Sequence, residues 1–248
     1  MSHDVRVAVF RPDDDRLTTA VELLESLGAT PVADPMLAVE PTGSQPTGDA
    51  EYTIFTSKTG VELAAAAGWE PTGTTLVSIG PGTSGAAEQV GWTVDREADT
   101  YSSSGLVELL ADEIDGRTVE VARSDHGSDV LLEGLDDANA EWSETVLYKL
   151  VRPAEAGKSA ELAAEGELEA VAFTSSLTVE HFLAAAADRG VRETALEGLD
   201  RAVVGVIGEP TRETAASHGI AVDIVPDEAT FESLATEVVE AAAPSYTE

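Results

Sequence analysis

Phe55-Thr56-Ser57 is repeated later in the chain as Phe173-Thr174-Ser175. A second phrase is also repeated, first as Ile79-Gly80-Pro81-Gly82-Thr83 and then as Ile207-Gly208-Glu209-Pro210-Thr211. Each of these four motifs follows a β-branched run and precedes a segment of helical period. Each therefore lies in a turn between a strand and a helix, and open α/β sheets bind ligands at such turns. We therefore expect two related α/β halves that form a cleft, with helix N-termini and their free N–H groups on both walls.

The repeat extends beyond these phrases in both directions. Val94-Asp95 returns as Val222-Asp223 at the same spacing that separates Thr83 from Thr211, and the opening strand Val7–Arg11 matches Val119–Arg123. Each copy thus consists of a β-α opening, a Phe-Thr-Ser unit and an Ile-Gly-x-x-Thr unit. This order indicates internal duplication.

Short apolar runs alternate with segments of helical period along the whole chain. Alternating strands and helices predict an α/β fold with parallel sheets covered on both faces. The expected strand and helix pairs are Val5–Phe10 with Asp14–Leu27, Tyr52–Phe55 with Lys58–Ala67, Thr75–Ile79 with Gly82–Val90, Thr118–Ala122 with Ser128–Asp137, Ala170–Phe173 with Ser176–Ala187, Ala202–Ile207 with Thr211–His218, and Ile220–Val225 with Phe231–Ala242.

Composition limits the class of protein. The 248 residues are 43% hydrophobic, enough for a large core, and no apolar stretch approaches the length of a membrane span. The start of the chain lacks the pattern of a signal peptide, so we expect a cytoplasmic protein. The absence of cysteine excludes disulfides, thiolate nucleophiles and sulfur-based zinc sites.

The chain is strongly acidic, with 14 basic and 47 acidic residues and a net charge of −33. Such a charge excludes non-specific binding to nucleic acid and to anionic membranes. The acids are spread over the whole chain and lysine is scarce, a composition typical of salt-accumulating organisms such as halophilic archaea. In about 1 M salt the Debye length is only about 3 Å, which would screen the self-repulsion. We interpret the charge as an adaptation to habitat.

The repeated loops allow two interpretations. Ser57 and Ser175 each precede a helix and are placed to cap its first turn, and they could also contact a ligand. The same alternatives apply to Thr83 and Thr211, beside Gly80 and Gly208, where a missing side chain lets the backbone approach a ligand closely.

Charged and aromatic candidates lie just outside these loops. Arg11 and Arg123 follow their strands and could hold a carboxylate bidentately or pair with acidic neighbours. The run Asp13-Asp14-Asp15 is better explained as a favourable helix start than as a metal site. The four histidines show no metal-ligand spacing, and we interpret them as surface or packed residues. Tyr148 is either a half-buried strand residue or a phenol that faces the cleft and donates a proton.

Taken together, the chain resembles the uroporphyrinogen-III synthase family, which makes a tetrapyrrole without a cofactor. The resemblance covers nearly the whole chain and rests on the order and spacing of several motifs. These are Arg11-Pro12, Phe55–Val61, Ile79–Thr83, Tyr101–Leu106, Val146-Leu147-Tyr148, Phe173–Ser175 and Ile207–Thr211.

The resemblance implies two flavodoxin-like domains joined by a two-strand linker. One domain would be discontinuous and comprise residues 1–34 and 154–248, and the other would comprise residues 42–147. The linkers would be residues 35–41 and 147–153, both of which lack helical period.

The resemblance also implies a reaction. Hydroxymethylbilane would lose its hydroxyl as water, invert its terminal D ring through a spiro intermediate and close to a macrocycle. Tyr148 matches the tyrosine proposed in the family to help the hydroxyl leave. The residues expected to bind the substrate are Arg11, Ser57, Lys58, Gly80, Thr83, Ser102, Arg123, Ser175, Gly208 and Thr211.

We thus expect a monomer that uses no metal or cofactor. Its expected partner is the small-molecule substrate, and we expect it to bind neither nucleic acid nor a membrane. A non-catalytic two-domain binding protein or sensor for an anionic metabolite is the alternative, because duplicated α/β domains suit that role equally well.

Overall fold

The computed structural model describes residues 5–243, which divide into two compact units. Unit 1 contains residues 5–38 and 151–243, and unit 2 contains residues 39–150. The chain therefore begins unit 1, builds all of unit 2 and then returns to complete unit 1. The segments expected as linkers contain strand β3 (Ala38–Pro41) and the end of strand β8 (Glu141–Val151).

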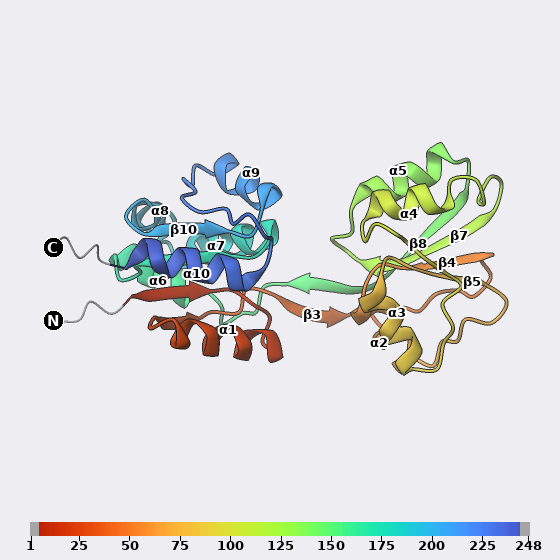
Figure 1. Cartoon of the computed structure of the whole chain (residues 1–248), viewed down its shortest axis with the longest axis horizontal. Coiled ribbons are helices and arrows are strands. Elements are labelled where there is room, and N and C mark those ends of the chain that lie inside the picture. The colour runs from red at the N-terminus through yellow and green to blue at the C-terminus, as the bar shows by residue number, and fades with distance from the viewer. Residues whose placement is uncertain (1–4, 244–248) are drawn as a thin grey trace. The chain divides into compact units, whose positions relative to one another are not determined.

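Unit 1 is built on a four-stranded sheet in the order β10-β9-β1-β2. The helices that surround this sheet are labelled in Figure 1. All three strand pairs in it are parallel. The strands are β1 (Arg6–Val9), β2 (Thr30–Ala33), β9 (Ala170–Phe173) and β10 (Val203–Val206).

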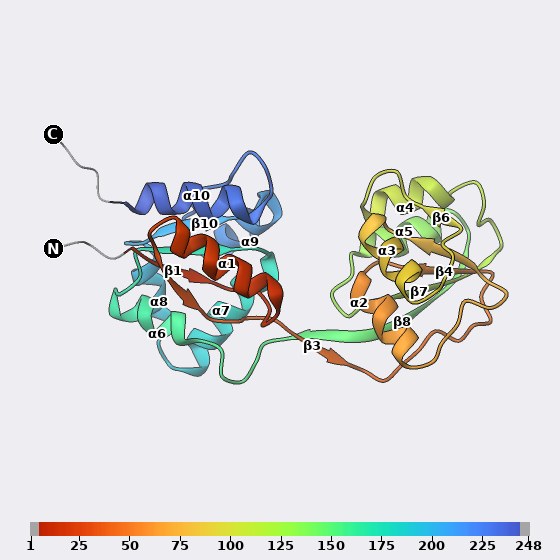
Figure 2. The same cartoon turned by 60° about the horizontal axis from the view of Figure 1, so that its bottom comes forward.

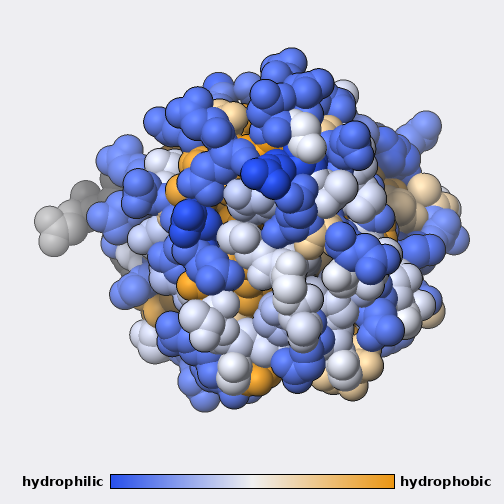
Figure 3. All heavy atoms as spheres, turned by 90° about the vertical axis from the view of Figure 1, so that its right-hand side faces the viewer, coloured by the Kyte–Doolittle hydropathy of each residue, from blue (hydrophilic) through white to orange (hydrophobic). Residues whose placement is uncertain are grey.

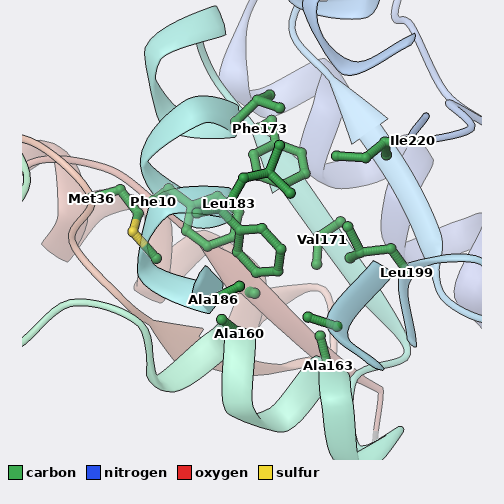
Figure 4. Close-up of a cluster of buried hydrophobic side chains, with 14 of the residues drawn as sticks. Phe10, Met36, Ala160, Ala163, Val171, Phe173, Leu183, Ala186, Leu199 and Ile220 are labelled. Carbon is green, nitrogen blue, oxygen red and sulfur yellow. The ribbon is translucent and has the colours of Figure 1, made fainter. Parts of the chain in front are cut away.

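Helices cover both faces of this sheet because its central strands are apolar on both sides. Val7 and Val9 pack with helices α1 (Asp15–Ser26) and α10 (Phe231–Ala242), which lie side by side (Figure 2). Ala8 and Phe10 belong to the opposite core, and Phe10 stacks on Phe173 at 4.8 Å between ring centroids (Figure 4). The helices of that core are α6 (Lys158–Glu165), α7 (Ser176–Asp188), α8 (Arg192–Leu199) and α9 (Glu209–Ser217).

Unit 2 contains a six-stranded sheet in the order β3-β8-β7-β4-β5-β6. The strands not yet given are β4 (Tyr52–Phe55), β5 (Thr75–Ser78), β6 (Arg96–Glu97) and β7 (Thr118–Ser124). Buried residues of α2 (Lys58–Ala66) and α3 (Pro81–Gln89) form one core with Phe55 and Leu76. Those of α4 (Ser103–Leu110) and α5 (Asp129–Asp137) form the other with Ile54 and Val77. The predicted α/β class with two mainly parallel sheets is confirmed.

The two sheets share one topology, as a duplication requires. The order β5-β4-β7-β8 in unit 2 corresponds to β10-β9-β1-β2 in unit 1. In each copy an aspartate side chain also accepts a hydrogen bond from a backbone N–H of the sheet. Asp95 Oδ2 accepts from the Leu76 N–H at 2.9 Å, and Asp223 Oδ2 accepts from the Val204 N–H at 2.8 Å. The two aspartates correspond in the repeat, and so do the two residues whose N–H groups they bind. Residues that match in the sequence repeat therefore make the same hydrogen bond in both units.

One expected strand did not form. Within Ile220–Val225, only Ile224 makes a β-bridge, to Gly205. The Asp223 side chain takes the Val204 N–H, so residues before Ile224 do not pair with β10, just as β6 begins only after Asp95. Helices α4, α6 and α8 and strands β2 and β6 are additions to the predicted pairs.

Candidate active site

A cavity of about 200 Å³ lies in unit 2 at the carboxyl ends of β4, β5 and β7. This is the edge at which open α/β sheets bind ligands. Its lining combines polar groups with a few apolar ones: Thr56, Ser57, Ile79, Ser103, Arg123, Ser124, His126, Gly127, Ser128, Leu131 and Tyr148. The structure thus brings three of the predicted site residues, Ser57, Arg123 and Tyr148, to one cavity.

Tyr148 is a buried strand residue that also lines the cavity. It is 7% exposed and packs in the same core as Phe55 and Val61, while it also lines the cavity. Its hydroxyl donates to Ser57 Oγ at 3.0 Å. The core holds the ring, so the phenol is presented to the cavity in a fixed position.

Ser57 caps a helix, one of the two roles considered for it, and it also lines the cavity. Its backbone is extended and its Oγ accepts from the Gly60 N–H at 3.0 Å, which caps α2. Gly60 lets the first turn of α2 approach Ser57 and Leu147 closely. A Cβ at this position would lie 3.2 Å from Ser57 Oγ and 3.3 Å from Leu147 Cδ1. A hydroxyl has two acceptor lone pairs and one proton. Both lone pairs are used by Gly60 and Tyr148, so the Ser57 proton is left to be donated.

Arg123 pairs with an acidic neighbour, one of the two outcomes considered for it. It is 5% exposed, its Nε donates to Glu144 at 2.5 Å, and its Nη1 donates to the Ser128 carbonyl at 2.7 Å. The guanidinium fills the space that a side chain at position 127 would need, since a Cβ on Gly127 would lie 2.4 Å from Arg123 Cδ. Arg123 therefore shapes the cavity wall while Glu144 neutralises its charge.

His126 is a site residue that the sequence analysis missed. It lines the cavity, and its Nδ1 lies 2.9 Å from Asp125 Oδ1, which also accepts from the Leu150 N–H at 3.0 Å. Burial of Asp125 acts to raise its pKa, but the hydrogen bonds from His126 and Leu150 outweigh it, so the pKa of Asp125 lies below its ordinary value. The available signal was the position of His126 in the short segment between the predicted strand Thr118–Ala122 and the helix predicted to start at Ser128.

The remaining predicted residues of unit 2 lie outside the cavity lining. Lys58 is exposed and pairs with Glu62 at 3.4 Å. Gly80 caps α3, and its carbonyl accepts from the N–H of the buried Thr83 at 3.0 Å. Ser102 Oγ caps α4 by accepting from the Gly105 N–H at 3.1 Å.

Unit 1 carries a second set of predicted residues at the carboxyl edge of its own sheet. Ser175 caps α7 in a capping box with Thr178. Gly208 caps α9, and the Thr211 side chain in the first turn is buried. These residues follow β9 and β10, which correspond to β4 and β5 of unit 2.

Arg11 lies in a separate groove of unit 1 with a volume of about 460 Å³, lined by residues of α1 and α10. Its guanidinium carbon is 4.8 Å from the centre of the Phe231 ring, and its buried Nε has no hydrogen-bond partner among the described residues. Burial, and then the charge of Arg16, lower the pKa of Arg11. An arginine with a free buried N–H is suited to receive a carboxylate.

No group of three or more His, Cys, Asp or Glu side chains within residues 5–243 is placed to hold a metal ion. His3, one of the four histidines considered above, lies outside that range. Within the same residues, no helix has the length and apolarity needed to cross a bilayer.

Residues 18–236 match the family model described as uroporphyrinogen-III synthase HemD. The chain is 31% identical over 230 residues to a protein of Methanothermobacter thermautotrophicus provisionally described as a uroporphyrinogen-III synthase, with 86% of this chain and 90% of the relative covered. It is 24% identical over 252 residues to a porphyrin biosynthesis protein HemD of Ruminiclostridium josui, which covers 95% of this chain and 48% of that longer protein.

Solved structures share the fold. A mutant uroporphyrinogen III synthase from the extremely thermophilic bacterium Thermus thermophilus superposes with a TM-score of 0.65 at 18% identity, covering 96% of this chain and 98% of the other. A uroporphyrinogen-III synthetase from Helicobacter pylori 26695 gives a TM-score of 0.61 at 15% identity, with 96% and 99% covered. Likeness at these identities concerns the architecture alone.

Proposed function

Because the chain belongs to the uroporphyrinogen-III synthase family, we propose that the unit 2 cavity beside Tyr148 is the place where it performs the reaction of that family. The activity is that of a hydro-lyase, and the family implies the linear tetrapyrrole hydroxymethylbilane as substrate. The observation that carries the proposal is the hydrogen bond of 3.0 Å from the Tyr148 hydroxyl to Ser57 Oγ at the cavity wall.

Loss of the substrate hydroxyl as water requires a proton at that oxygen. A phenol with its ordinary pKa of about 10 is protonated at neutral pH and can donate. The Ser57 hydroxyl can donate its proton to the leaving group, because Ser57 Oγ already accepts hydrogen bonds from Gly60 and from the Tyr148 hydroxyl. In our proposal Tyr148 therefore donates either directly or by replacing the proton that Ser57 hands to the leaving group.

Ring inversion is mainly a problem of geometry, because the free substrate is flexible and closes without inversion. Holding the reacting atoms in one arrangement removes much of the entropic barrier to attack at the substituted carbon. In our proposal the carboxylates of the substrate are held by the helix N-termini at Ser57, Thr83 and Ser102 in unit 2. Ser175, Gly208 and Thr211 would serve in the same way in unit 1, which also offers the free Nε of Arg11.

Backbone amides carry more of this binding than side-chain charges do. Glu144 neutralises Arg123 and Glu62 pairs with Lys58, so neither cation is free for a substrate carboxylate. The face of the molecule in Figure 3 is mostly hydrophilic, as a net charge of −33 leads one to expect. Screening by salt would then be needed for a polyanionic substrate to approach.

We further propose that the protein acts on this substrate as a monomer in the cytoplasm, without cofactor, nucleic acid or membrane. The charge of −33 opposes contact with polyanionic surfaces, and the lack of cysteine suits a reducing compartment.

The test is to incubate the protein with hydroxymethylbilane in molar KCl and to separate the type I and type III isomers. We expect the type III isomer to dominate. A reaction without protein gives the spontaneous type I baseline, and a heat-denatured sample controls for contaminants. Type I product at the spontaneous rate is the result expected of a non-catalytic protein, and it would overturn the proposal.

A further inference from the structure

Tyr101 is the most exposed large hydrophobic residue in the part of the chain that the structure describes. It is 65% exposed, whereas the others lie between 37% and 46%. It stands directly before Ser102, the N-cap of α4. Its exposed ring offers a flat apolar face on which another aromatic ring can stack.

The ring of Tyr101 is supported on one side by the backbone at the start of α3. A Cβ built on Gly80 would lie 2.8 Å from Cδ1 and 3.0 Å from Cγ of Tyr101. The absence of a side chain at position 80 is therefore what allows the ring to rest there. One side of the ring is held in place while much of the residue remains open to solvent.

The loops that carry Tyr101 and Gly80 border the unit 2 cavity, although neither residue is itself in the cavity lining. Ile79, next to Gly80, and Ser103, which closely follows Tyr101, both line the cavity. A ligand that fills the cavity beside Tyr148 and extends out of it over these two loops would meet the ring.

The duplication shows that the fold itself does not need an aromatic residue at this place. Ser102 accepts from the Gly105 N–H at 3.1 Å, and Thr230 accepts from the Ser233 N–H at 3.2 Å. The two helix caps correspond, because they have the same spacing in the sequence as Thr83 and Thr211. By this correspondence, Ala229 occupies the place of Tyr101 in unit 1.

The glycine beneath the ring differs in the same way between the two copies. A Cβ on Gly208, the counterpart of Gly80, would meet nothing within 4 Å. The aromatic ring with its glycine support is thus a property of unit 2 alone.

We infer that Tyr101 is a stacking platform for one pyrrole ring of the substrate at the rim of the unit 2 cavity. This inference rests on the proposed function and names a specificity residue for it. A pyrrole is flat and aromatic, and offset stacking on a tyrosine adds to the burial of its apolar face. The helix N-terminus capped by Ser102 lies beside the ring, so the platform also places a pyrrole carboxylate near free N–H groups.

The central experiment measures kcat and KM of Tyr101→Ala and Tyr101→Phe with hydroxymethylbilane. Tyr101→Ala should raise KM about tenfold, the change that about 1.4 kcal/mol of lost stacking produces. Its kcat should change less than about twofold, because Tyr148 and Ser57 are untouched. Tyr101→Phe keeps the ring and should retain the KM of the natural protein. Val130→Ala, at an exposed position of α5, is the control for loss of surface apolar area.

A second pair of variants tests the support of the ring. Gly80→Ala should raise KM in the same direction as Tyr101→Ala, because the new methyl group displaces the ring. Gly85→Ala adds the same methyl group in the same helix with nothing within 4 Å, and it should leave KM unchanged.

Direct binding separates this inference from the proposed function. The porphyrin obtained by oxidising the product serves as a fluorescent probe, titrated into the natural protein and Tyr101→Ala. If the natural protein forms no type III isomer, the proposed function fails, yet a weaker titration with Tyr101→Ala would still support the platform. Equal KM and equal porphyrin affinity for both proteins would overturn the platform alone. If Tyr101→Ala sediments more slowly than the natural protein while its KM is unchanged, the ring would instead serve self-association, and the platform would be overturned.

Discussion

The Tyr148 hydroxyl lies 3.0 Å from Ser57 Oγ, although the two residues are far apart in the sequence. The tyrosine comes from β8 and the serine from the turn after β4, and these strands flank β7 in the sheet. The fold thus places a phenol held by the core against a hydroxyl held by a helix start. The consequences can be measured one substitution at a time.

Tyr148→Phe should lower kcat by about a hundredfold or more, the range for loss of a general acid. The ring remains in its core, so the free energy of unfolding should change by about 1 kcal/mol or less, the net value of one hydrogen bond. Steady-state kinetics and urea unfolding, both in molar KCl, measure the two effects. An unchanged kcat would remove Tyr148 from the mechanism.

Ser57→Ala should lose both stability and activity, whereas a matched cap should lose stability alone. Ser57 caps α2 and Thr230 caps α10, each through one backbone N–H in the first turn. Each substitution by alanine should cost about 1 kcal/mol of unfolding free energy. Only Ser57→Ala also removes the partner of Tyr148, so only its kcat should fall. Equal kcat values in the two variants would reduce Ser57 to a helix cap.

Turnover should rise with salt. With a net charge of −33 the protein repels a substrate that carries several carboxylates. Raising KCl from about 0.1 M to about 1 M shortens the Debye length from about 10 Å to about 3 Å. We expect KM to fall about tenfold or more over this range. Circular dichroism at each concentration shows whether the protein is folded. A KM independent of salt in the folded protein would contradict this explanation.

Asp125 should make the stability depend on pH in the acid range. Burial acts to raise its folded pKa, but the hydrogen bonds from His126 and Leu150 outweigh burial and lower the pKa. Its stabilisation is therefore fully present above the ordinary carboxyl pKa of about 3.9, and it is lost as pH falls through the lower folded value. The natural protein should exceed Asp125→Asn in unfolding free energy at pH 7, and the difference should shrink below about pH 4. A difference that stays constant with pH would show that the carboxylate charge has no part in it.

Much of the fold could be predicted because local pattern and tertiary structure agree. The strand at Tyr52–Phe55 and the helix at Phe231–Ala242 have the predicted bounds, since alternating or helical apolar positions meet clear caps there. Helices α6 and α8 lack a pattern of large apolar residues, because they pack against each other through small residues. At Gly198 of α8 a Cβ would lie 1.8 Å from the Ala163 carbonyl oxygen of α6, an approach that only glycine permits.

Three of the predicted site residues, Ser57, Arg123 and Tyr148, line the cavity, but their arrangement was not predicted. Repeated motifs indicated Ser57, whereas Tyr148 was considered for its phenol and was then matched by the resemblance to a family. Neither indicated their hydrogen bond, because it joins a repeated loop to a strand residue that has no place in the repeated motifs. His126 was interpreted as a surface or packed histidine because the four histidines show no metal-ligand spacing. It is exposed, and its place in the cavity lining depends on the turn after β7, where it contacts Asp125.

The order of the strands has a consequence for synthesis on the ribosome. β1 lies between β2 and β9, and β9 begins only at Ala170. The part of unit 1 that precedes unit 2 must therefore wait, with one side of β1 unpaired, until the whole of unit 2 has emerged. Unit 2 is continuous, so it can fold while the nascent chain is still growing. A fragment that ends near residue 150 and is released from the ribosome should thus resist protease within unit 2, while its N-terminal segment is cleaved.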